Sequence, residues 1–137
     1  MQNWHKGKVL KGDRHGRTIG FPTVNLDPEI IPMTLKHGIY AAKVRYGNKE
    51  YLGTLFFGPR LVKGENHPVL EIYIHDFQKD IYDQEVKFII NSFIRDVRHF
   101  ADLEELKKEM ERDIEKTRHL VRFDKIASSP AERGSSQ

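Results

Sequence analysis

The sequence contains no cysteine, and this absence excludes several classes of protein at once. Disulfide frameworks, thiolate zinc sites and cysteine nucleophiles all require that side chain. Long apolar runs are missing too, so we expect neither a membrane-spanning helix nor a secretory signal. Together these absences favour a cytoplasmic protein that does not bind a membrane.

A strong excess of one charge is also missing. Lys and Arg number 23 against 20 Asp and Glu, which gives a net charge of +3. Because the two signs are interspersed, an ordinary solvated surface explains this balance better than a polyanion-binding surface does. The length of 137 residues and the 38% hydrophobic content predict one folded domain, residues 1–125. We expect residues 126–137 to form a disordered polar tail.

Hydrophobic periodicity predicts short antiparallel strands followed by one helix. Residues 38–46 and 50–57 read as two strands of a β-hairpin joined at Gly47-Asn48, and residues 5–10 supply an earlier strand. Residues 69–77 and 85–94 predict a second hairpin, joined across the polar segment QKDIYDQ.

The helix is predicted by apolar residues at three- and four-residue spacing from about Asp102 to about Arg122. Asp102 and Glu105 have the spacing of an N-terminal capping box. Many short strands with one terminal helix favour a mostly β fold, a small closed or nearly closed barrel with the helix packed on it.

The stretch KGDRHGRTIGFPTVNL, residues 11–26, concentrates glycines and basic side chains. Gly12, Gly16 and Gly20 allow backbone N–H groups to approach a bulky anion such as a polyphosphate, and Arg17 adds positive charge. The Walker A and dinucleotide-binding patterns are absent. By composition alone, a flexible surface loop explains these residues equally well.

The segment FPTVN that ends this stretch carries two neutral oxygen donors. Pro22 favours an extended or turning backbone here. Thr23 and Asn25 lie on alternate positions, so both could face one ligand. Such groups suit Mg²⁺ whose coordination is completed by water and substrate phosphates. From the residues alone, a local turn that satisfies backbone groups is the better-supported interpretation.

Four blocks of the sequence resemble a riboflavin kinase domain in their order and spacing, over roughly residues 4–114. They are GKVLKGDRHGRTIGFPTVNL, HGIYAAKV, PVLEIYIHDFQKDIYDQEVKF and FIRDVRHFADLEELKKEMERDI. The most specific element is G-x-P-T-x-N, followed much later by a glutamate on a strand. The resemblance implies a six-stranded Greek-key β-barrel with a C-terminal helix. It also implies transfer of the γ-phosphate of ATP to the ribityl 5′-hydroxyl of riboflavin, which gives FMN.

The resemblance further implies a role for each matching residue. Glu71 is implied as the catalytic base, and Arg95 as a flavin contact. The metal, Mg²⁺ or another divalent ion, and the phosphates of ATP are implied to lie against Thr23 and Asn25. The nucleotide-binding loop is implied to include Gly12, Gly16, Arg17 and Gly20.

The residues around Glu71 support its role independently. Leu70, Ile72 and Ile74 form the apolar face of a predicted strand, so Glu71 and Tyr73 share the other face with His75. A carboxylate there could accept the hydroxyl proton and align the oxygen for attack on phosphorus. A solvent-facing strand carboxylate is the ordinary alternative.

The sequence departs from the family pattern at three loops. Gly58-Pro59, followed by Arg60, stands where many members have Asn-Pro or Arg-Pro. Asp83 replaces the glycine of Tyr-Gly, and Arg95-Asp96-Val97 replaces Arg-Pro-Glu. Nothing resembles the adenylyltransferase module of bifunctional flavin enzymes, so we expect the chain to stop at FMN.

Two alternatives come from other functional classes. A non-catalytic barrel could bind a flavin or nucleotide without turnover, or a basic barrel could stack single-stranded nucleic acid on rings such as Trp4 or Tyr73. Thr23, Asn25 and Glu71 favour the kinase, because they have no special role in the nucleic-acid alternative. We therefore expect riboflavin and ATP as partners, no nucleic acid, and a monomer.

Overall fold

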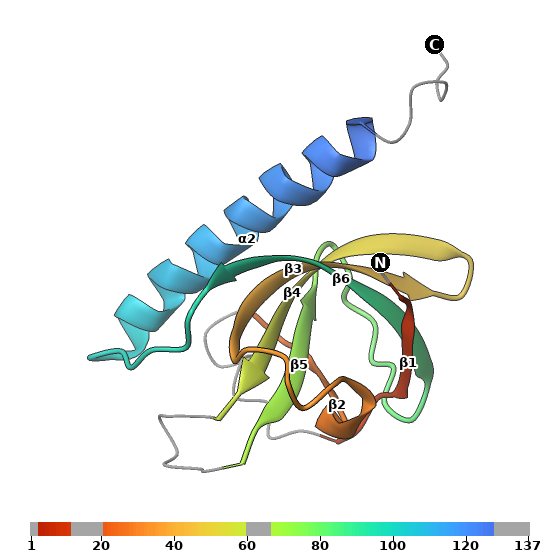
Figure 1. The fold of residues 1–137 in the computed structure, drawn as a ribbon, viewed down its shortest axis with the longest axis horizontal. Coiled ribbons are helices and arrows are strands. Elements are labelled where there is room, and N and C mark those ends of the chain that lie inside the picture. Colours follow the sequence, from red (N-terminus) through yellow and green to blue (C-terminus); the bar gives the residue numbers. More distant parts are fainter. Residues whose placement is uncertain (1–2, 12–20, 60–66, 128–137) are drawn as a thin grey trace.

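The computed structural model describes residues 3–11, 21–59 and 67–127. Over these ranges the chain forms six strands, a short 3-10 helix and one long helix (Figure 1). The elements are β1 (His5–Lys8), β2 (Val24–Leu26), η1 (Pro28–Ile30), β3 (Gly38–Tyr46), β4 (Lys49–Gly58), β5 (Val69–Ile74), β6 (Glu85–Arg95) and α2 (Leu103–Ala127).

The strands form one antiparallel sheet in the order β1-β6-β3-β4-β5-β2. β3, β4 and β5 follow one another as neighbours, and β6 returns to lie beside β3, which is a Greek key. The sheet curls so that its two edges, at β1 and β2, meet. The Leu10 N–H, just after β1, donates to the carbonyl of Asn25 on β2 at 2.7 Å. The predicted six-stranded Greek-key barrel with a C-terminal helix is therefore confirmed.

The predicted hairpin of residues 69–77 and 85–94 is wrong. β5 pairs with β4 and β2, whereas β6 pairs with β3 and β1. The connection between them, residues 75–84, is more than a polar turn, because Ile81 is only 2% exposed and belongs to the barrel core. Burying this apolar side chain keeps the connection against the barrel and delivers β6 to a different neighbour. The first hairpin, β3 and β4, is confirmed, with Gly47 in the left-handed conformation of its turn.

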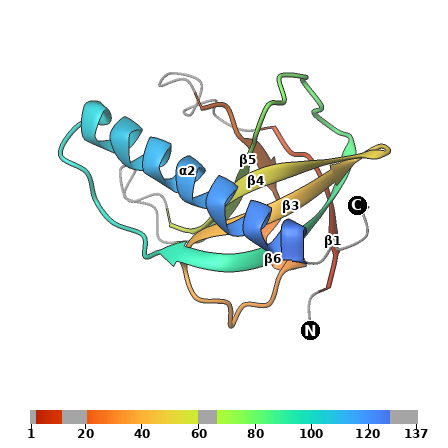
Figure 2. The same ribbon diagram turned by 90° about the horizontal axis from the view of Figure 1, so that it is seen from above.

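The barrel core contains the inward faces of the strands. The predicted apolar face of β5, Leu70, Ile72 and Ile74, is confirmed as part of this core. On β3, Ile39 and Ala41 are buried on the opposite, outer face. Helix α2 crosses the outer surface of the sheet over β3 and β4 and covers that face (Figure 2). The protein thus has two apolar layers, one inside the barrel and one under α2.

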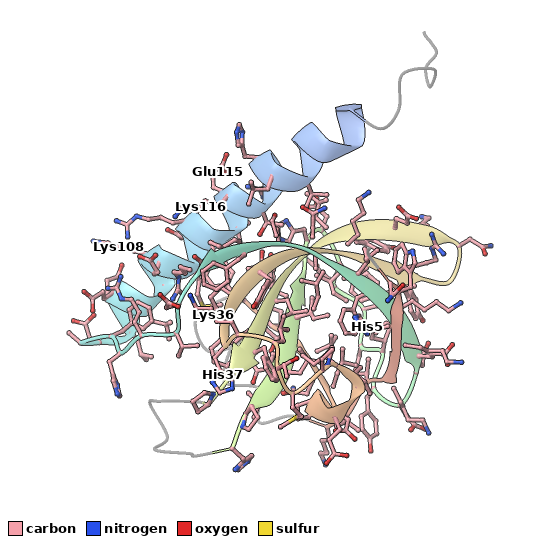
Figure 3. All side chains as sticks on the ribbon, viewed as in Figure 1. His5, Lys36, His37, Lys108, Glu115 and Lys116 are labelled. Atoms are coloured by element: carbon pink, nitrogen blue, oxygen red, sulfur yellow. The ribbon has the colours of Figure 1, made fainter. Side chains whose placement is uncertain are left out.

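Helix α2 begins where its N-cap predicts. The Glu105 N–H donates to Asp102 Oδ1 at 2.8 Å, but the Glu105 carboxylate accepts from the Ala101 N–H, so the predicted capping box is displaced by one residue. The helix continues to Ala127, past its predicted end at Arg122 and into the first residues of the predicted tail. Residues 128–137 lie outside the described residues. The charged side chains Lys108, Glu115 and Lys116 are exposed on the side of α2 away from the barrel (Figure 3).

Within the described ranges, no helix combines the length and apolar character needed to cross a bilayer.

Candidate active site

The strand register aligns predicted site residues in a single row across the outer face of the sheet. The row runs over five neighbouring strands and consists of Arg95, Ile39, Phe56, Glu71 and Asn25. Directly opposite residues in a sheet point to the same face, about 5 Å apart. The row therefore begins with a cation, passes over two apolar side chains and ends with a carboxylate and an amide.

The end of the row brings together residues that are far apart in the sequence. Asn25 on β2 lies opposite Glu71 on β5, and Thr23 precedes it by two positions on the same face. Thr23 Oγ1 donates to Glu71 Oε1 at 3.4 Å, which is a long hydrogen bond. The predicted base and both predicted metal ligands therefore share one corner of the molecule.

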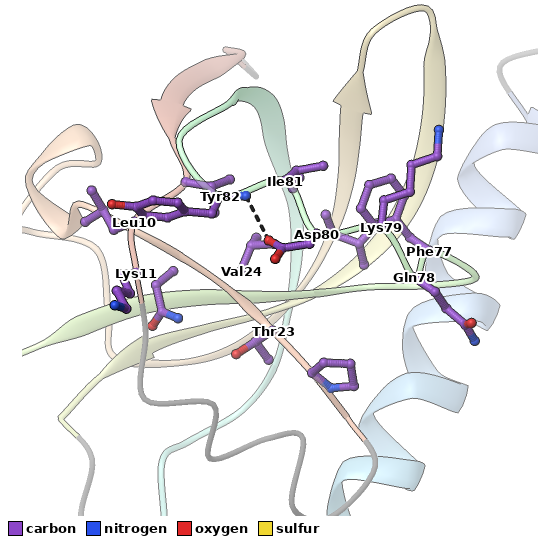
Figure 4. Close-up of a pocket in the computed structure, with 14 residues that line it drawn as sticks. Leu10, Lys11, Thr23, Val24, Phe77, Gln78, Lys79, Asp80, Ile81 and Tyr82 are labelled. Atoms are coloured by element: carbon purple, nitrogen blue, oxygen red, sulfur yellow. Dashed lines mark hydrogen bonds between the residues drawn. The ribbon is translucent and has the colours of Figure 1, made fainter.

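A cleft of about 550 Å³ opens beside this corner (Figure 4). Thr23 and Asn25 line it from β2, and the connection between β5 and β6 forms the opposite wall. Its lining residues are Val9, Leu10, Lys11, Pro22, Thr23, Val24, Asn25, Ile74, Phe77, Gln78, Lys79, Asp80, Ile81 and Tyr82. The cleft is large enough for a nucleotide-sized ligand.

Sequence reasoning missed the wall formed by Phe77 to Tyr82. The missed signal was the mixture of apolar and charged residues in a segment that was interpreted only as a turn. Lys11 and Lys79 bring positive charge to the cleft. Asp80 Oδ1 accepts a hydrogen bond from the Tyr82 N–H at 3.2 Å, which fixes the local backbone (Figure 4).

The donor set at this corner fits a magnesium ion that brings its own ligands. No group of three or more His, Asp or Glu side chains among the described residues could hold a metal alone. Thr23 and Asn25 supply neutral oxygens on the wall of an open cleft. Mg²⁺ is commonly bound by few protein oxygens together with water and substrate phosphates.

Arg95 is held at the other end of the row by α2. Its Nε and Nη2 donate to the two carboxylate oxygens of Asp113 at 2.9 and 2.8 Å, and Glu109 Oε2 lies 3.4 Å from Nε. The Arg95 side chain is 14% exposed. Burial raises the pKa of Asp113 above its usual range, although the hydrogen bonds from Arg95 oppose that shift. The predicted flavin contact is therefore a guanidinium with a fixed direction.

The remaining predicted residues divide into two groups. Gly12, Gly16, Arg17 and Gly20 lie outside the described residues, so their predicted role stays a prediction. Of the loop departures, Asp83 occupies the left-handed region with φ 72°, and Gly58 has φ 152°. Asp96 forms an exposed ion pair with Lys36 at 3.2 Å.

The family profile and the curated relatives point to one family. Residues 3–121 match the sequence profile of the flavokinase family, described as riboflavin kinase. The RNA-binding riboflavin kinase RibR of Bacillus subtilis is 37% identical over 109 residues, 79% of this chain and 46% of the relative. A bifunctional riboflavin kinase/FMN adenylyltransferase of Listeria monocytogenes is 36% identical over 82% of this chain and 36% of the relative. The chain thus spans less than half the length of these two relatives.

A solved structure extends the comparison to the fold. Riboflavin kinase from Trypanosoma brucei matches with a TM-score of 0.68 at 24% identity, over 99% of this chain and 92% of that one. At this identity the likeness concerns the fold alone. The profile match over most of the chain shows the relationship directly: the chain belongs to the riboflavin kinase (flavokinase) family.

Proposed function

We propose that this chain is a riboflavin kinase that transfers the γ-phosphate of ATP to the ribityl 5′-hydroxyl of riboflavin and releases FMN and ADP. The observation that carries the proposal is the place of Glu71 in the cross-strand row. It lies between the fixed guanidinium of Arg95 and the oxygen donors of Thr23 and Asn25. A substrate hydroxyl and a terminal phosphate could therefore meet beside its carboxylate.

Glu71 acts as the base and as the aligner of the nucleophile. The ribityl oxygen forms a bond to the γ-phosphorus while the bond from that phosphorus to the oxygen of ADP breaks. The hydroxyl proton passes to the Glu71 carboxylate. Phosphoryl transfer depends mainly on positioning and charge stabilisation, so alignment of the oxygen is the larger contribution. The hydrogen bond from Thr23 limits how far the carboxylate can turn.

Thr23 and Asn25 would hold Mg²⁺ together with the phosphates of ATP, and the ion would neutralise phosphate charge. The rest of the nucleotide occupies the cleft between β2 and the Phe77–Tyr82 wall. The phosphate-binding role of Gly12, Gly16, Arg17 and Gly20, which precede β2 in the sequence, stays a prediction. Amide hydrogen exchange in residues 12–20 should therefore slow when Mg-ADP binds, and unchanged exchange would remove the loop from the site.

Riboflavin lies along the row with its ribityl chain toward Glu71. Arg95 and Glu71 are three strands apart, about 15 Å at the usual strand spacing. Between them, Ile39 is buried, whereas Phe56 is half-buried and suits contact with an aromatic ring system. Arg95 supplies a hydrogen-bond donor at the far end.

Further expectations belong to the same proposal. We infer a cytoplasmic monomer whose partners are riboflavin and ATP. The absence of nucleic-acid binding stays a prediction, and the name of the Bacillus subtilis relative makes it worth testing. A fluorescent single-stranded RNA should show no binding at physiological salt.

The deciding experiment incubates the purified protein with riboflavin and Mg-ATP and separates the flavins by chromatography. We expect FMN, equimolar ADP and no FAD, with no FMN when EDTA removes the metal. Riboflavin binding without FMN would favour the non-catalytic flavin-binding barrel. Neither binding nor turnover, with tight RNA binding, would favour the nucleic-acid barrel.

A further inference from the structure

A chain of hydrogen bonds beneath the surface connects His75, the residue after strand β5, to helix α2. His75 Nε2 lies 2.8 Å from Thr54 Oγ1, which lies 2.8 Å from Thr117 Oγ1. Thr117 Oγ1 in turn donates to the backbone carbonyl of Asp113 at 2.9 Å. His75 is 3% exposed and Thr117 is fully buried. We call these four residues the His75–Asp113 chain.

The direction of every bond in the chain follows from proton counting. The single hydroxyl proton of Thr117 is used on the Asp113 carbonyl, so Thr117 can only accept from Thr54. Thr54 therefore donates its own proton and must accept from His75. This fixes His75 as the Nε2–H tautomer, and its Nδ1 is an acceptor.

The His75–Asp113 chain includes an unfavourable feature that a purely apolar contact would avoid. His75 Nδ1 is buried and has no hydrogen-bond partner among the described residues. A buried polar atom without a partner is unfavourable, and apolar side chains of similar shape would join β4, β5 and α2 without it. Directional bonds differ from apolar contacts in one respect, because the bond between Thr54 and Thr117 restricts where α2 can lie relative to β4.

Both ends of the chain lead to residues of the proposed site. His75 follows β5, the strand that carries Glu71, and Thr54 lies on β4 opposite Tyr73, one row along from Phe56 and Glu71. At the other end, Asp113 holds the guanidinium of Arg95 through both carboxylate oxygens. The chain thus links the strand of the base to the helix that directs the proposed flavin contact.

We propose that Thr54 is a positioning residue for riboflavin. It is the central member of the chain, and it fixes α2, and with it Arg95, relative to Glu71. This inference rests on the proposed function and goes beyond it, because Thr54 contacts neither of the proposed reacting groups. Removing the Thr54 hydroxyl leaves the Arg95 and Glu71 side chains unchanged. The distance between them should then be less strictly fixed.

Thr54→Val tests the inference, because it keeps the shape of the side chain and removes the hydroxyl from both hydrogen bonds. Thr54→Ser keeps the hydroxyl and should therefore keep riboflavin affinity and turnover. Thr34→Val is the control, because it makes the same change at an exposed position. Measurements are made well below each variant's melting temperature. They are the riboflavin Kd from flavin fluorescence, kcat, and the KM for ATP.

For Thr54→Val we expect a riboflavin Kd about tenfold higher and a kcat about tenfold lower, with the KM for ATP within about twofold, since a small misplacement is enough for such losses. Thr54→Ser and Thr34→Val should resemble the unaltered chain. A lower melting temperature with unchanged Kd and kcat would overturn the inference and show that the His75–Asp113 chain only stabilises the fold. If the unaltered protein binds riboflavin without turnover, the comparison of riboflavin Kd values still decides. If the unaltered protein neither binds riboflavin nor turns it over, the proposed function and this inference fail together.

Discussion

Acid should destabilise this protein through His75 over a defined pH range. Burial, with a smaller contribution from the nearby Arg118 guanidinium, lowers the pKa of His75 from 6.5 to about 4, and Asp76 opposes the shift. In the unfolded chain the imidazole is solvated and returns to its ordinary pKa. The unfolded state therefore binds a proton between these two values, and the folded state does not.

The sign and size follow from proton linkage. Because the folded pKa is the lower one, stability is unaffected above about pH 7 and falls as the pH drops toward 4. The complete shift corresponds to about 3 kcal/mol, of which about 2 kcal/mol is lost between pH 7.5 and pH 5. Below about pH 4 both states are protonated and His75 contributes no further change.

The assay compares urea unfolding of the unaltered chain with His75→Gln at several pH values. Glutamine places an N–H donor near the position of Nε2, so the bond to Thr54 can persist, but it cannot titrate. Subtracting the two free energies of unfolding removes other groups, including Asp113, whose raised pKa acts in the opposite direction. The difference should fall by about 2 kcal/mol from pH 7.5 to pH 5. A difference that does not change with pH would refute a neutral, buried His75.

Three other predictions concern single positions. Thr23→Ala should lower FMN formation most at limiting Mg²⁺ while riboflavin affinity, measured by fluorescence, stays within about twofold; full turnover at limiting metal would contradict the metal role. Gly53→Ala should lower the free energy of urea unfolding by about 1–3 kcal/mol, because its Cβ would lie 2.8 Å from Val44 Cγ2 and 2.9 Å from Ile72 Cγ2; an unchanged midpoint would mean that the barrel yields there. Asp83 has φ 72°, so Asp83→Val should lower the free energy of urea unfolding by about 1–2 kcal/mol and Asp83→Gly should leave it unchanged; equal effects of the two substitutions would exclude backbone strain.

Local sequence patterns predicted the helix and every strand except β2, but not all of the strand pairing. The alternation of Leu70, Ile72 and Ile74 identifies the inner face of β5, because side-chain direction in a strand depends only on position. The partner of β6 depends on where residues 75–84 travel. The burial of Ile81 in the barrel core determines that path, and it is a tertiary contact that no local pattern contains.

The sequence could predict which residues belong to the site, but not how they are arranged in space. Thr23, Asn25 and Glu71 were identified through the family resemblance, and their meeting at one corner follows from the β2–β5 register. The bidentate pairing of Arg95 with Asp113 requires the position of α2 on the sheet. The His75–Asp113 chain joins residues 21 and 63 positions apart, so its members have no shared signal in the sequence.

The central claim is that Glu71 aligns the ribityl hydroxyl and accepts its proton, and a single-turnover measurement with Glu71→Gln tests it most directly. Glutamine keeps the size of the side chain and removes the charge and the proton acceptor. With enzyme in excess over riboflavin, the account predicts a rate of FMN formation lower by about 10²- to 10⁴-fold. The melting temperature and Mg-ATP affinity should be unchanged. A rate within a few-fold of the unaltered chain would contradict the assignment of the base to Glu71.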